Sequence, residues 1–390
     1  MVFCNHGSFG ACPRSVLARQ AALRRRMERD PYRFLVRELP PLLEHARFKL
    51  AAFVGAQHQD LVFVDNATAA VNTVLASLPL QPGDEILTTD HAYGACRNAM
   101  HHAASRSGAV VRTASIPFPI ASPQEVIDAV LAACSSRTRL AVIDHVTSPT
   151  ALVFPIESLV RELQRRDVRV LVDGAHAPGM IALRLDDLGA DYFAANGHKW
   201  LCAPKGSAFL FVRRDRQSEI RPLVISHAAS LPAGDPRRFQ EEFAWTGTND
   251  PTARIATSDA IDWGASLLAG GWEERMRRNH SMAVEARKIL CDILAIEPPC
   301  PESMLGAMAS LPLPNDILPA PLDGVIPDPL HTMLRSKYRI DVPIIPWPHP
   351  PSRLVRVSAQ LYNTLDHYTE LALVLARLRS STIALARVFV

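Results

Sequence analysis

The sequence predicts an α/β fold in which helices cover both faces of a mainly parallel central sheet. In the middle of the chain, short apolar runs typical of strands alternate with longer segments in which apolar residues recur at helical spacing. The runs are almost continuously apolar, as in VRVLVD at 168–173, which indicates strands buried on both faces. A length of 390 residues suggests two domains.

The expected elements alternate in the order that a parallel sheet requires. The helix over 123–133 follows Ser122 and begins at Pro123, which are favourable N-cap and first-turn residues. The helix over 93–106 stops before Gly108, a residue that commonly follows a helix end. The remaining elements are a helix over 69–78, strands over 84–89, 109–116 and 139–146, a helix over 156–166, and strands over 168–173, 190–195 and 207–213.

The two ends of the chain have different patterns. Residues 14–52 are mainly helical in pattern and rich in arginine, with a break expected at Pro40–Pro41. Residues 272–294 form one long helical pattern, and short strands and loops then lead to a final helix near 365–378.

We therefore expect the chain to form three parts. Residues 50–265 form a large domain that carries the central sheet. Residues 266–390 form a smaller α+β C-terminal domain. Residues 1–49 form an N-terminal segment that packs with the small domain and with the active site.

Charge and composition exclude several classes of protein. The formal net charge is only +3, which argues against a nucleic-acid binder and against a highly charged disordered chain. No run of 18 apolar residues is present, so we expect no membrane-spanning helix. The seven cysteines show no CxxC spacing and the N-terminus lacks a secretory signal pattern, so we expect a reducing compartment, the cytoplasm.

Asp173 ends the apolar run at 168–173 and is followed by a turn of small residues that contains His176. Ligands of open α/β sheets bind beyond the carboxyl ends of the strands, so a carboxylate at this point faces a binding site. The alternative is an aspartate that caps a turn or a helix.

Lys199 follows His198 after the apolar run at 190–195. A lysine at the end of a buried strand is partly desolvated, which lowers the pKa of its amine and makes it a nucleophile towards carbonyl groups. The chain has only five lysines, and Lys205, after Pro204, is the main competitor. The alternative for either lysine is a surface position in a turn.

The segment DNATAAVNT at 65–73 opens a helix after the strand-like run LVFV. Backbone N–H groups and the helix dipole at such a turn bind anions, and Thr68 adds a hydroxyl donor. The commoner explanation of these residues is an N-cap.

Together these three features fit one cofactor, pyridoxal phosphate. The cofactor needs a lysine for its Schiff base, an aspartate beside its pyridine nitrogen and anion donors for its phosphate. Lys199, Asp173 and the turn at Thr68 supply these three groups.

A series of motifs occurs in a fixed order along nearly the whole chain. The motifs are NHGSFG at 5–10, FVDNATAAVNT at 63–73, GDEILTTDHAYGA at 83–95, DHVTSPTA at 144–151, VDGAHAPG at 172–179, GHKW at 197–200, PKG at 204–206, WTGTNDP at 245–251 and VRVSAQLYNT at 355–364. On these motifs the sequence resembles the class-V aminotransferase family of fold type I pyridoxal phosphate enzymes, in particular its isopenicillin N epimerase-like branch. The resemblance implies the fold type I architecture, with a large domain and a smaller α+β C-terminal domain.

The resemblance also implies roles around the cofactor. Lys199 matches the Schiff-base lysine and Asp173 matches the partner of the pyridine nitrogen. His176 lies close to the ring, and Ser148 falls near the ring hydroxyl. The positions that match contacts to the phosphate are Ala67, Thr68, Asn196 and His198, with Gly247 and Thr248 supplied by the partner subunit of a homodimer.

Further positions match residues that contact the ring face or the substrate. His91 and Tyr93 compete for stacking on the ring, because His91 matches the position used by class-V desulfurases and Tyr93 is the aromatic residue that this branch offers. Arg356 matches the arginine that binds the substrate α-carboxylate, a role that suits a planar guanidinium. Asn5 and His6 belong to a segment that is expected to fold over the active site, where neighbouring glycines allow close approach of the backbone.

These residues allow three reactions at the α-carbon of an amino acid or an amino-acid-containing substrate. Epimerisation removes a proton from one face and returns it to the other, with Lys199 serving one face and Tyr93 or His6 the second. A C–S β-lyase or an aminotransferase needs only Lys199. We favour epimerisation because isopenicillin N epimerase-like is the family label nearest to this sequence, although the same branch also contains lyase-like members.

Two other functions are disfavoured. A cysteine desulfurase needs a nucleophilic cysteine shortly before the substrate arginine, and the nearest one, Cys300, lies more than fifty residues before Arg356. A pyridoxal phosphate-binding protein without catalysis has no use for a carboxylate-binding arginine. The stretch 298–351 holds 14 of the 31 prolines and occupies the position of the desulfurase loop, so we expect it to help set the choice of substrate.

Overall fold

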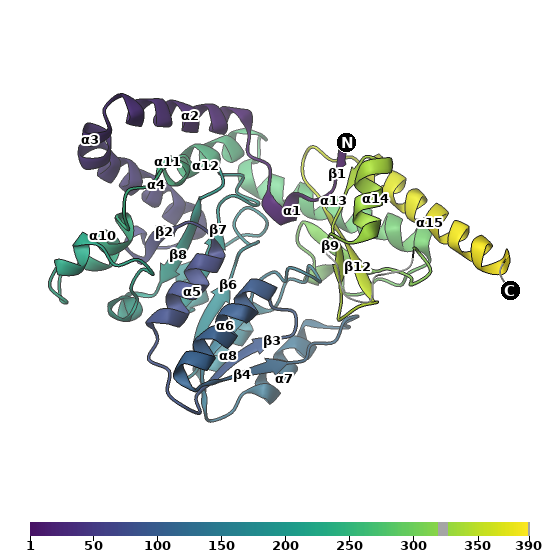
Figure 1. The fold of residues 1–390 in the computed structure, drawn as a ribbon, viewed down its shortest axis with the longest axis horizontal. Helices are drawn as coiled ribbons and strands as arrows, with labels where there is room; N and C mark the ends of the chain where they lie inside the picture. The colour runs from purple at the N-terminus through teal and green to yellow at the C-terminus, as the bar shows by residue number, and fades with distance from the viewer. Residues whose placement is uncertain (319–326, 389–390) are drawn as a thin grey trace.

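The computed structural model describes residues 1–318 and 327–388, and a seven-stranded sheet forms its centre (Figure 1). The strands are β2 (Leu61–Val64), β3 (Glu85–Thr89), β4 (Val110–Ala114), β5 (Thr138–Asp144), β6 (Arg169–Asp173), β7 (Tyr192–Asn196) and β8 (Ala208–Val212). Their order across the sheet is β2-β8-β7-β6-β5-β3-β4. Neighbouring strands from β7 to β4 run parallel, whereas β8 runs antiparallel to both β7 and β2. The mainly parallel sheet predicted from the sequence is therefore confirmed.

Helices cover both faces of this sheet. Helices α5 (Ala67–Ser77) and α6 (Gly94–Ser107) pack together on one face, and α7 (Pro123–Ala133) and α8 (Ile156–Gln164) pack together on the other. Each helix was predicted from its apolar spacing, and each begins and ends within a few residues of the expected bounds.

Strand β5 shows why the central strands are apolar throughout. Leu140 and Val142 belong to the apolar layer that includes α5 and α6, whereas Ala141 and Ile143 belong to the layer on the opposite face. Successive side chains of a strand point to opposite faces, so a sheet covered on both faces buries every residue of such a strand.

The C-terminal part of the chain forms a second, antiparallel sheet with the strand order β11-β12-β9. Its strands are β9 (Met308–Pro312), β11 (Ile344–Pro346) and β12 (Arg353–Ser358). The long helix α13 (Gly271–Leu294) packs against this sheet and against α15 (Leu365–Val388).

The N-terminal segment joins this C-terminal part. Strand β1 (Val2–Phe3) pairs in parallel with β10 (Ile340–Asp341), and α1 (His6–Phe9) follows at the junction between the two parts of the molecule (Figure 1). The chain then returns to the large sheet through α2 (Arg14–Arg29).

Two expectations about the helices are wrong. The helical N-terminal region breaks at Asp30, between α2 and α3 (Pro31–Arg33), and not at Pro40–Pro41, which lie in the first turn of α4 (Leu39–Val54). A π-helical turn at Phe34–Glu38 precedes these prolines, so the chain there does not need the N–H groups that prolines lack.

Helix α14 (Pro329–Lys337) was also not expected. Asp328 caps this helix by accepting the N–H of Leu330 over 2.7 Å, so Asp328–Pro329 was the local start signal. The remaining helices are α9 (Leu185–Leu188), α10 (Arg238–Ala244), α11 (Thr252–Ile255) and α12 (Thr257–Ser266), with 3-10 helices at His58–Asp60, Arg214–Glu219, His227–Ser230 and Glu302–Met304.

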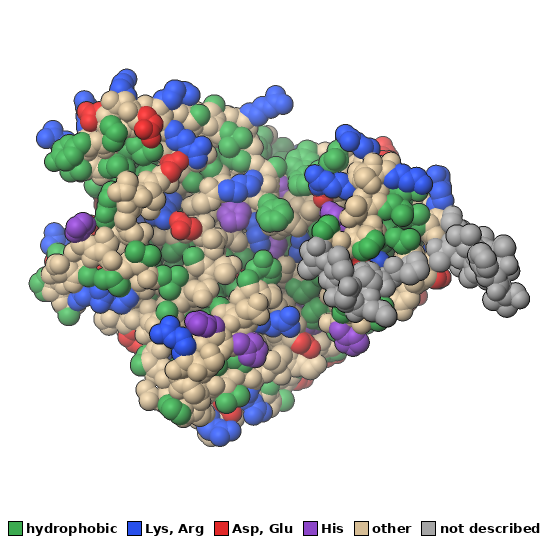
Figure 2. All heavy atoms as spheres, viewed as in Figure 1, with side chains coloured by type: hydrophobic (Ala, Val, Ile, Leu, Met, Phe, Trp, Pro, Cys, Tyr) green, Lys and Arg blue, Asp and Glu red, His purple; other side chains and the backbone are tan. Residues whose placement is uncertain are grey.

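The surface agrees with the low net charge. On the face shown in Figure 2, Lys and Arg side chains are spread over several elements and are interspersed with Asp and Glu, so this face carries no single basic patch. Within residues 1–318 and 327–388, no helix combines the length and the apolar character needed to cross a bilayer.

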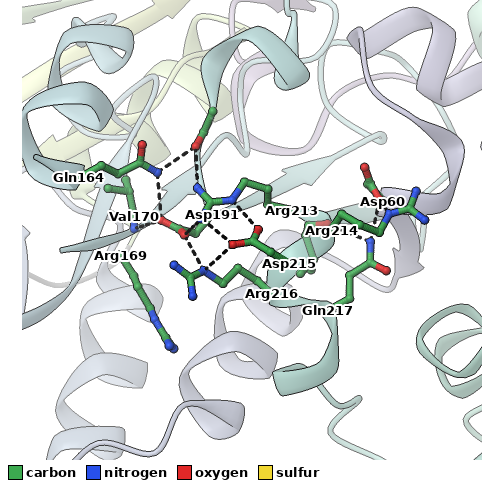
Figure 3. A network of polar contacts seen from close by, with 12 residues as sticks. Asp60, Gln164, Arg169, Val170, Asp191, Arg213, Arg214, Asp215, Arg216 and Gln217 are labelled. Atoms are coloured by element: carbon green, nitrogen blue, oxygen red, sulfur yellow. Dashed lines mark hydrogen bonds and ion pairs between the residues drawn. The ribbon is translucent and has the colours of Figure 1, made fainter. Parts of the chain in front are cut away.

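A polar network fixes the start of β7, the strand that leads to Lys199 (Figure 3). Asp191 is 1% exposed and accepts the N–H of Val170 over 2.9 Å. The same carboxylate accepts from Arg216 over 3.0 Å and forms an ion pair with Arg213 at 2.9 Å. This buried carboxylate therefore ties β6, β7 and the turn after β8 together.

Candidate active site

An inner cavity of about 180 Å³ lies at the carboxyl ends of β5, β6 and β7. The carboxyl ends of parallel strands are where ligands of α/β sheets bind. The residues predicted from the sequence that line this cavity are Ala67, Thr68, Tyr93, Ser148, Asp173, His176, Asn196, His198 and Lys199. Side chains that are distant in the sequence therefore meet in one place.

Lys199 lies in the turn after β7, with its Nζ 3.1 Å from Nε2 of His176. The indole N–H of Trp200 donates to Nδ1 of this imidazole over 3.3 Å, and burial lowers the pKa of His176 well below its usual range. The single imidazole proton is therefore on Nε2, and it donates to Nζ when Lys199 is in its free-amine form. Burial lowers the pKa of Lys199 to about 8, while Asp173 opposes the shift and Arg356 adds to it.

Asp173 is the last residue of β6 and is 3% exposed. Its Oδ1 accepts the N–H of Ala175 over 3.0 Å, and its Oδ2 accepts the thiol of Cys96 over 3.2 Å. Both oxygens of this carboxylate are therefore held in place by a donor. An anion at this depth suits the protonated ring nitrogen of a pyridine cofactor.

The N-terminus of α5 faces the same cavity. Asn66 caps the helix by accepting the N–H of Ala69 over 2.8 Å, and Asn196 accepts the N–H of Ala67 over 2.9 Å. The N–H of Ala67 is already paired. Thr68, which also lines the cavity, is therefore the residue at this helix end that can donate to an anion.

His198 adds a neutral imidazole to the wall. Its Nδ1 donates to the carbonyl oxygen of Ser207 over 3.3 Å, and burial lowers the pKa of His198 to about 4. A lysine amine of lowered pKa, a buried carboxylate and a helix N-terminus with a hydroxyl group thus surround one cavity. These are the partners that pyridoxal phosphate needs, so the residues fit this cofactor.

Arg356 reaches the site from β12 and is 3% exposed. Its Nη1 donates to the carbonyl oxygen of Ser148 over 2.6 Å, and its Nη2 donates to the hydroxyl of Ser8 over 3.0 Å. Its Nε has no hydrogen-bond partner in the part of the chain that the structure describes. Burial lowers the pKa of Arg356 to about 10, so the guanidinium stays charged at neutral pH. A buried cation paired only with neutral groups favours binding of an anion from outside the chain.

An outer cavity of about 750 Å³ adjoins the inner one and contains Arg356 in its wall. The two cavities are joined because Ser8, Phe9, Tyr93 and Ser148 line both. A second wall of the outer cavity is the apolar segment 343–348 (PIIPWP), which belongs to the proline-rich stretch. Residues 319–326 of that stretch lie outside the described residues.

The structure separates the two candidates for stacking on the cofactor ring. Tyr93 precedes α6 and lines both cavities. His91 is fully buried and lines neither cavity: its Nε2 donates to the carbonyl oxygen of Ile116 over 3.1 Å, and its Nδ1 lies 2.7 Å from the hydroxyl of Thr150. His91 also packs edge-on against Trp347, with 4.5 Å between the ring centroids. His91 therefore supports the cavity wall, and the stacking role that we propose passes to Tyr93.

The N-terminal motif packs beneath the lysine turn. Asn5 lines the outer cavity, whereas His6 is fully buried and lines neither cavity. Nε2 of His6 lies 3.1 Å from the carbonyl oxygen of Lys199. Gly10 has a φ of +70°, and a Cβ there would lie 2.1 Å from the carbonyl oxygen of His198, so only glycine fits.

Gly247 and Thr248 lie in a partly exposed loop after α10 and line neither cavity of their own chain. The contact implied by the family resemblance comes from a partner subunit, so the homodimer stays a prediction.

Two buried residues at the site were not singled out from the sequence. Asp144 ends β5 and lines the inner cavity, and Cys96 on α6 donates to Asp173. The signal for Asp144 was present, because the apolar run at 139–146 reaches a carboxylate as the run before Asp173 does. The contact of Cys96 depends on how α6 lies over the sheet, and no local pattern predicts it.

Comparison with known proteins gives one family. A family model described as aminotransferase class-V matches residues 34–307. An isopenicillin N epimerase of Amycolatopsis lactamdurans is 39% identical, over 94% of this chain and 92% of its own length. A probable chloroplastic L-cysteine desulfhydrase of Arabidopsis thaliana is 33% identical, over 94% of this chain and 80% of its own length.

Solved structures share the fold. The cystine C-S lyase C-DES in complex with its product cysteine persulfide has a TM-score of 0.81 at 22% identity, covering 96% of this chain and 97% of that chain. A mutant of C-DES with glycine covalently linked to its PLP cofactor has a TM-score of 0.78 at 22% identity, covering 97% of this chain and 96% of that chain.

Proposed function

The chain belongs to the aminotransferase class-V family and is a pyridoxal phosphate-dependent enzyme, and we propose that it epimerises the α-carbon of an amino-acid-containing substrate, as an isopenicillin N epimerase-like enzyme. The observation that carries the substrate class is Arg356, a buried guanidinium whose Nε is unpaired among the described residues and which lines the outer cavity. A carboxylate is the ligand that such a group binds best. An amino acid held there by its α-carboxylate extends towards Lys199.

Two side chains support the exchange of the α-proton between faces. Lys199 follows β7 and Tyr93 follows β3, on opposite sides of the strand that ends in Asp173, and both line the inner cavity. Bound pyridoxal phosphate supplies the electron sink that stabilises negative charge on the α-carbon. Lys199 takes the proton as a free amine on one side, and the hydroxyl of Tyr93 returns a proton on the other. The buried position of His6 makes it the weaker candidate for the second group.

The outer cavity supports a bulky substrate. Its volume of about 750 Å³ falls in the range of about 300–1,000 Å³ that suits ligands much larger than one free amino acid. The apolar wall at 343–348 faces the part of the substrate beyond the α-carbon, which fits the expected role of the proline-rich stretch.

A C–S β-lyase is the second candidate. L-cysteine desulfhydrases are 31–33% identical over 94–96% of this chain, close to the values for the epimerases. A lyase needs only one base, so Lys199 alone suffices for it. None of the seven cysteines lines either cavity, which argues against a persulfide-forming cysteine at this site.

The experiment that separates these reactions is turnover of amino-acid and amino-acid-containing substrates in D₂O. Epimerisation gives deuterium at the α-carbon with inversion, a lyase gives pyruvate, and an aminotransferase requires a keto acid. For Tyr93→Phe we expect deuterium to enter the α-carbon still, through Lys199, while inversion falls at least about tenfold, since general acid–base catalysis contributes about 10²–10⁴-fold.

Tyr32→Phe is the matched control, because Tyr32 is 71% exposed on α3 and lines neither cavity. Inversion that persists unchanged in Tyr93→Phe would remove Tyr93 as the second group. Pyruvate release by the wild type without any inversion would replace the epimerase with the lyase.

A further inference from the structure

Two carboxylates end neighbouring strands beneath the inner cavity. Asp144 is the last residue of β5 and Asp173 is the last residue of β6, and the two are paired in register in the parallel sheet. Residues in register on adjacent strands project their side chains to the same face. Both are buried, at 4% and 3% exposure, and both line the inner cavity.

The two carboxylates differ in their hydrogen-bond donors. Asp173 accepts a thiol from Cys96 and an N–H from Ala175. The carboxyl group of Asp144 interacts with the backbone N–H groups of Tyr93, the residue that lines both cavities, and of Asp144 itself. The thiol donor that reaches the pair therefore goes to Asp173, and Asp144 is joined to the backbone of the residue proposed to stack on the ring.

We propose that Asp144 is a positioning residue of the cofactor site, which stays a neutral carboxylic acid, holds Tyr93 at the cavity wall and leaves the single negative charge of the pair on Asp173. Two carboxylates that share a desolvated site do not both ionise. Burial raises the pKa of Asp144 well above its usual range, and the neighbouring Asp173 adds to the shift. The proposal rests on the cofactor, and it holds for an epimerase and for a lyase alike.

A neutral Asp144 has a consequence for Lys199. The charged or titratable groups that face Asp144 are Asp173 on β6, Lys199 after β7 and Cys96 on α6. A second negative charge would favour the ammonium form of Lys199 and would exceed the one positive charge on the cofactor ring nitrogen. One charge on Asp173 therefore matches the ring and adds no further stabilisation to the ammonium form of Lys199.

The test is a pair of variants, Asp144→Asn and Asp144→Ala, examined by titrating pyridoxal phosphate into the apo-enzyme and by titrating the visible absorption of the holoenzyme with pH. Asn is a neutral mimic of the carboxylic acid and still accepts from Tyr93, so we expect its Kd to stay within about threefold of wild type and its spectral midpoint to stay unchanged. Ala removes the acceptor, so we expect the Kd to rise about tenfold.

Infrared spectroscopy of the wild-type holoenzyme gives a direct readout of the proton. We expect a C=O stretching band of a buried carboxylic acid that disappears in Asp144→Asn and persists in Asp187→Asn. Asp187 is the matched control, because it is exposed on α9 and its substitution removes one negative charge far from the site.

Three results would overturn the proposal: a midpoint shift of more than about one pH unit in Asp144→Asn, a carboxylic acid band that this variant leaves unchanged, or wild-type affinity in Asp144→Ala. If Asp144→Ala does not fold, Asp144→Asn decides alone. Failure of the wild type to bind pyridoxal phosphate at all would instead contradict the cofactor, so the two failures are distinguishable.

Discussion

At the scale of single residues, the amine of Lys199 is the clearest case of a group whose surroundings set its chemistry. Burial and repulsion from Arg356 both disfavour the ammonium form of Lys199 and lower its pKa. Attraction to Asp173 partly offsets this shift. The Nε2–H of His176 finds an acceptor in the free-amine form of Lys199. The result is an amine that loses its proton at about pH 8, below the ordinary value for lysine.

We predict from this that the attachment of pyridoxal phosphate to the apo-enzyme follows the titration of Lys199. The attacking species is the free amine, so the rate should rise as pH increases through about 8 and then level off. Stopped-flow absorbance over a pH series measures it, and Lys199→Ala should show no covalent attachment. A rate that keeps rising to pH 10.5, the ordinary value for lysine, would contradict the lowered pKa.

Sequence patterns identified some residues of the site and not others, for physical reasons. Asp173 and Lys199 come at the ends of apolar strands, and parallel strands bring their carboxyl ends to one edge of the sheet. The local pattern was therefore enough to predict that these two side chains lie near each other. Arg356 lies on a different sheet, and only the family resemblance connected it with Lys199. His91 and Tyr93 are only two residues apart, yet Tyr93 lines the cavity and His91 is buried behind its wall. The position of His91 depends on its contacts with Thr150 and Trp347, which no periodicity in the sequence predicts.

At the scale of elements, β7 shows how a strand is fixed at one end so that its other end can carry chemistry. Asp191 holds the start of the strand through the N–H of Val170 and the side chains of Arg213 and Arg216, and Lys199 follows the far end (Figure 3).

The helix bounds were largely predictable from apolar spacing, whereas the continuous helix through Pro40–Pro41 was not, because a π-helical turn has no signal in that spacing.

We predict that Asp191→Ala lowers the free energy of unfolding by about 3 kcal/mol, because it leaves the buried N–H of Val170 without its acceptor and removes the buried carboxylate that Arg213 and Arg216 share. Asp215→Ala is the matched control, since Asp215 also pairs with Arg213 and Arg216 but its side chain is 56% exposed. We expect that variant to lose less than about 1 kcal/mol. Denaturant unfolding of both holoenzymes measures the difference, and equal losses would show that the network does not depend on its buried carboxylate.

At the scale of the whole molecule, the proposed active site is assembled from three stretches that are remote in the sequence. The large sheet supplies the cavity around Lys199, and the C-terminal sheet supplies Arg356. The N-terminal segment lies between them, and its Ser8 hydroxyl accepts a hydrogen bond from Arg356. The N-terminal segment is anchored at one side by β1 and at the other by Gly10 against the lysine turn. The proposed cofactor and substrate sites are thus joined by the packing of the two parts against each other.

The central claim is that the site binds an amino acid through its α-carboxylate at Arg356, beside the cofactor on Lys199. The most direct test is a spectral titration of the holoenzyme with an amino-acid substrate and with the matching amine that lacks the carboxylate, in wild type and in Arg356→Ala. We predict that Arg356→Ala weakens amino-acid binding about a hundredfold, leaves amine binding unchanged and keeps the visible spectrum of the bound cofactor. Equal binding of the amino acid and the amine by the wild type, or unchanged amino-acid binding in Arg356→Ala, would contradict it.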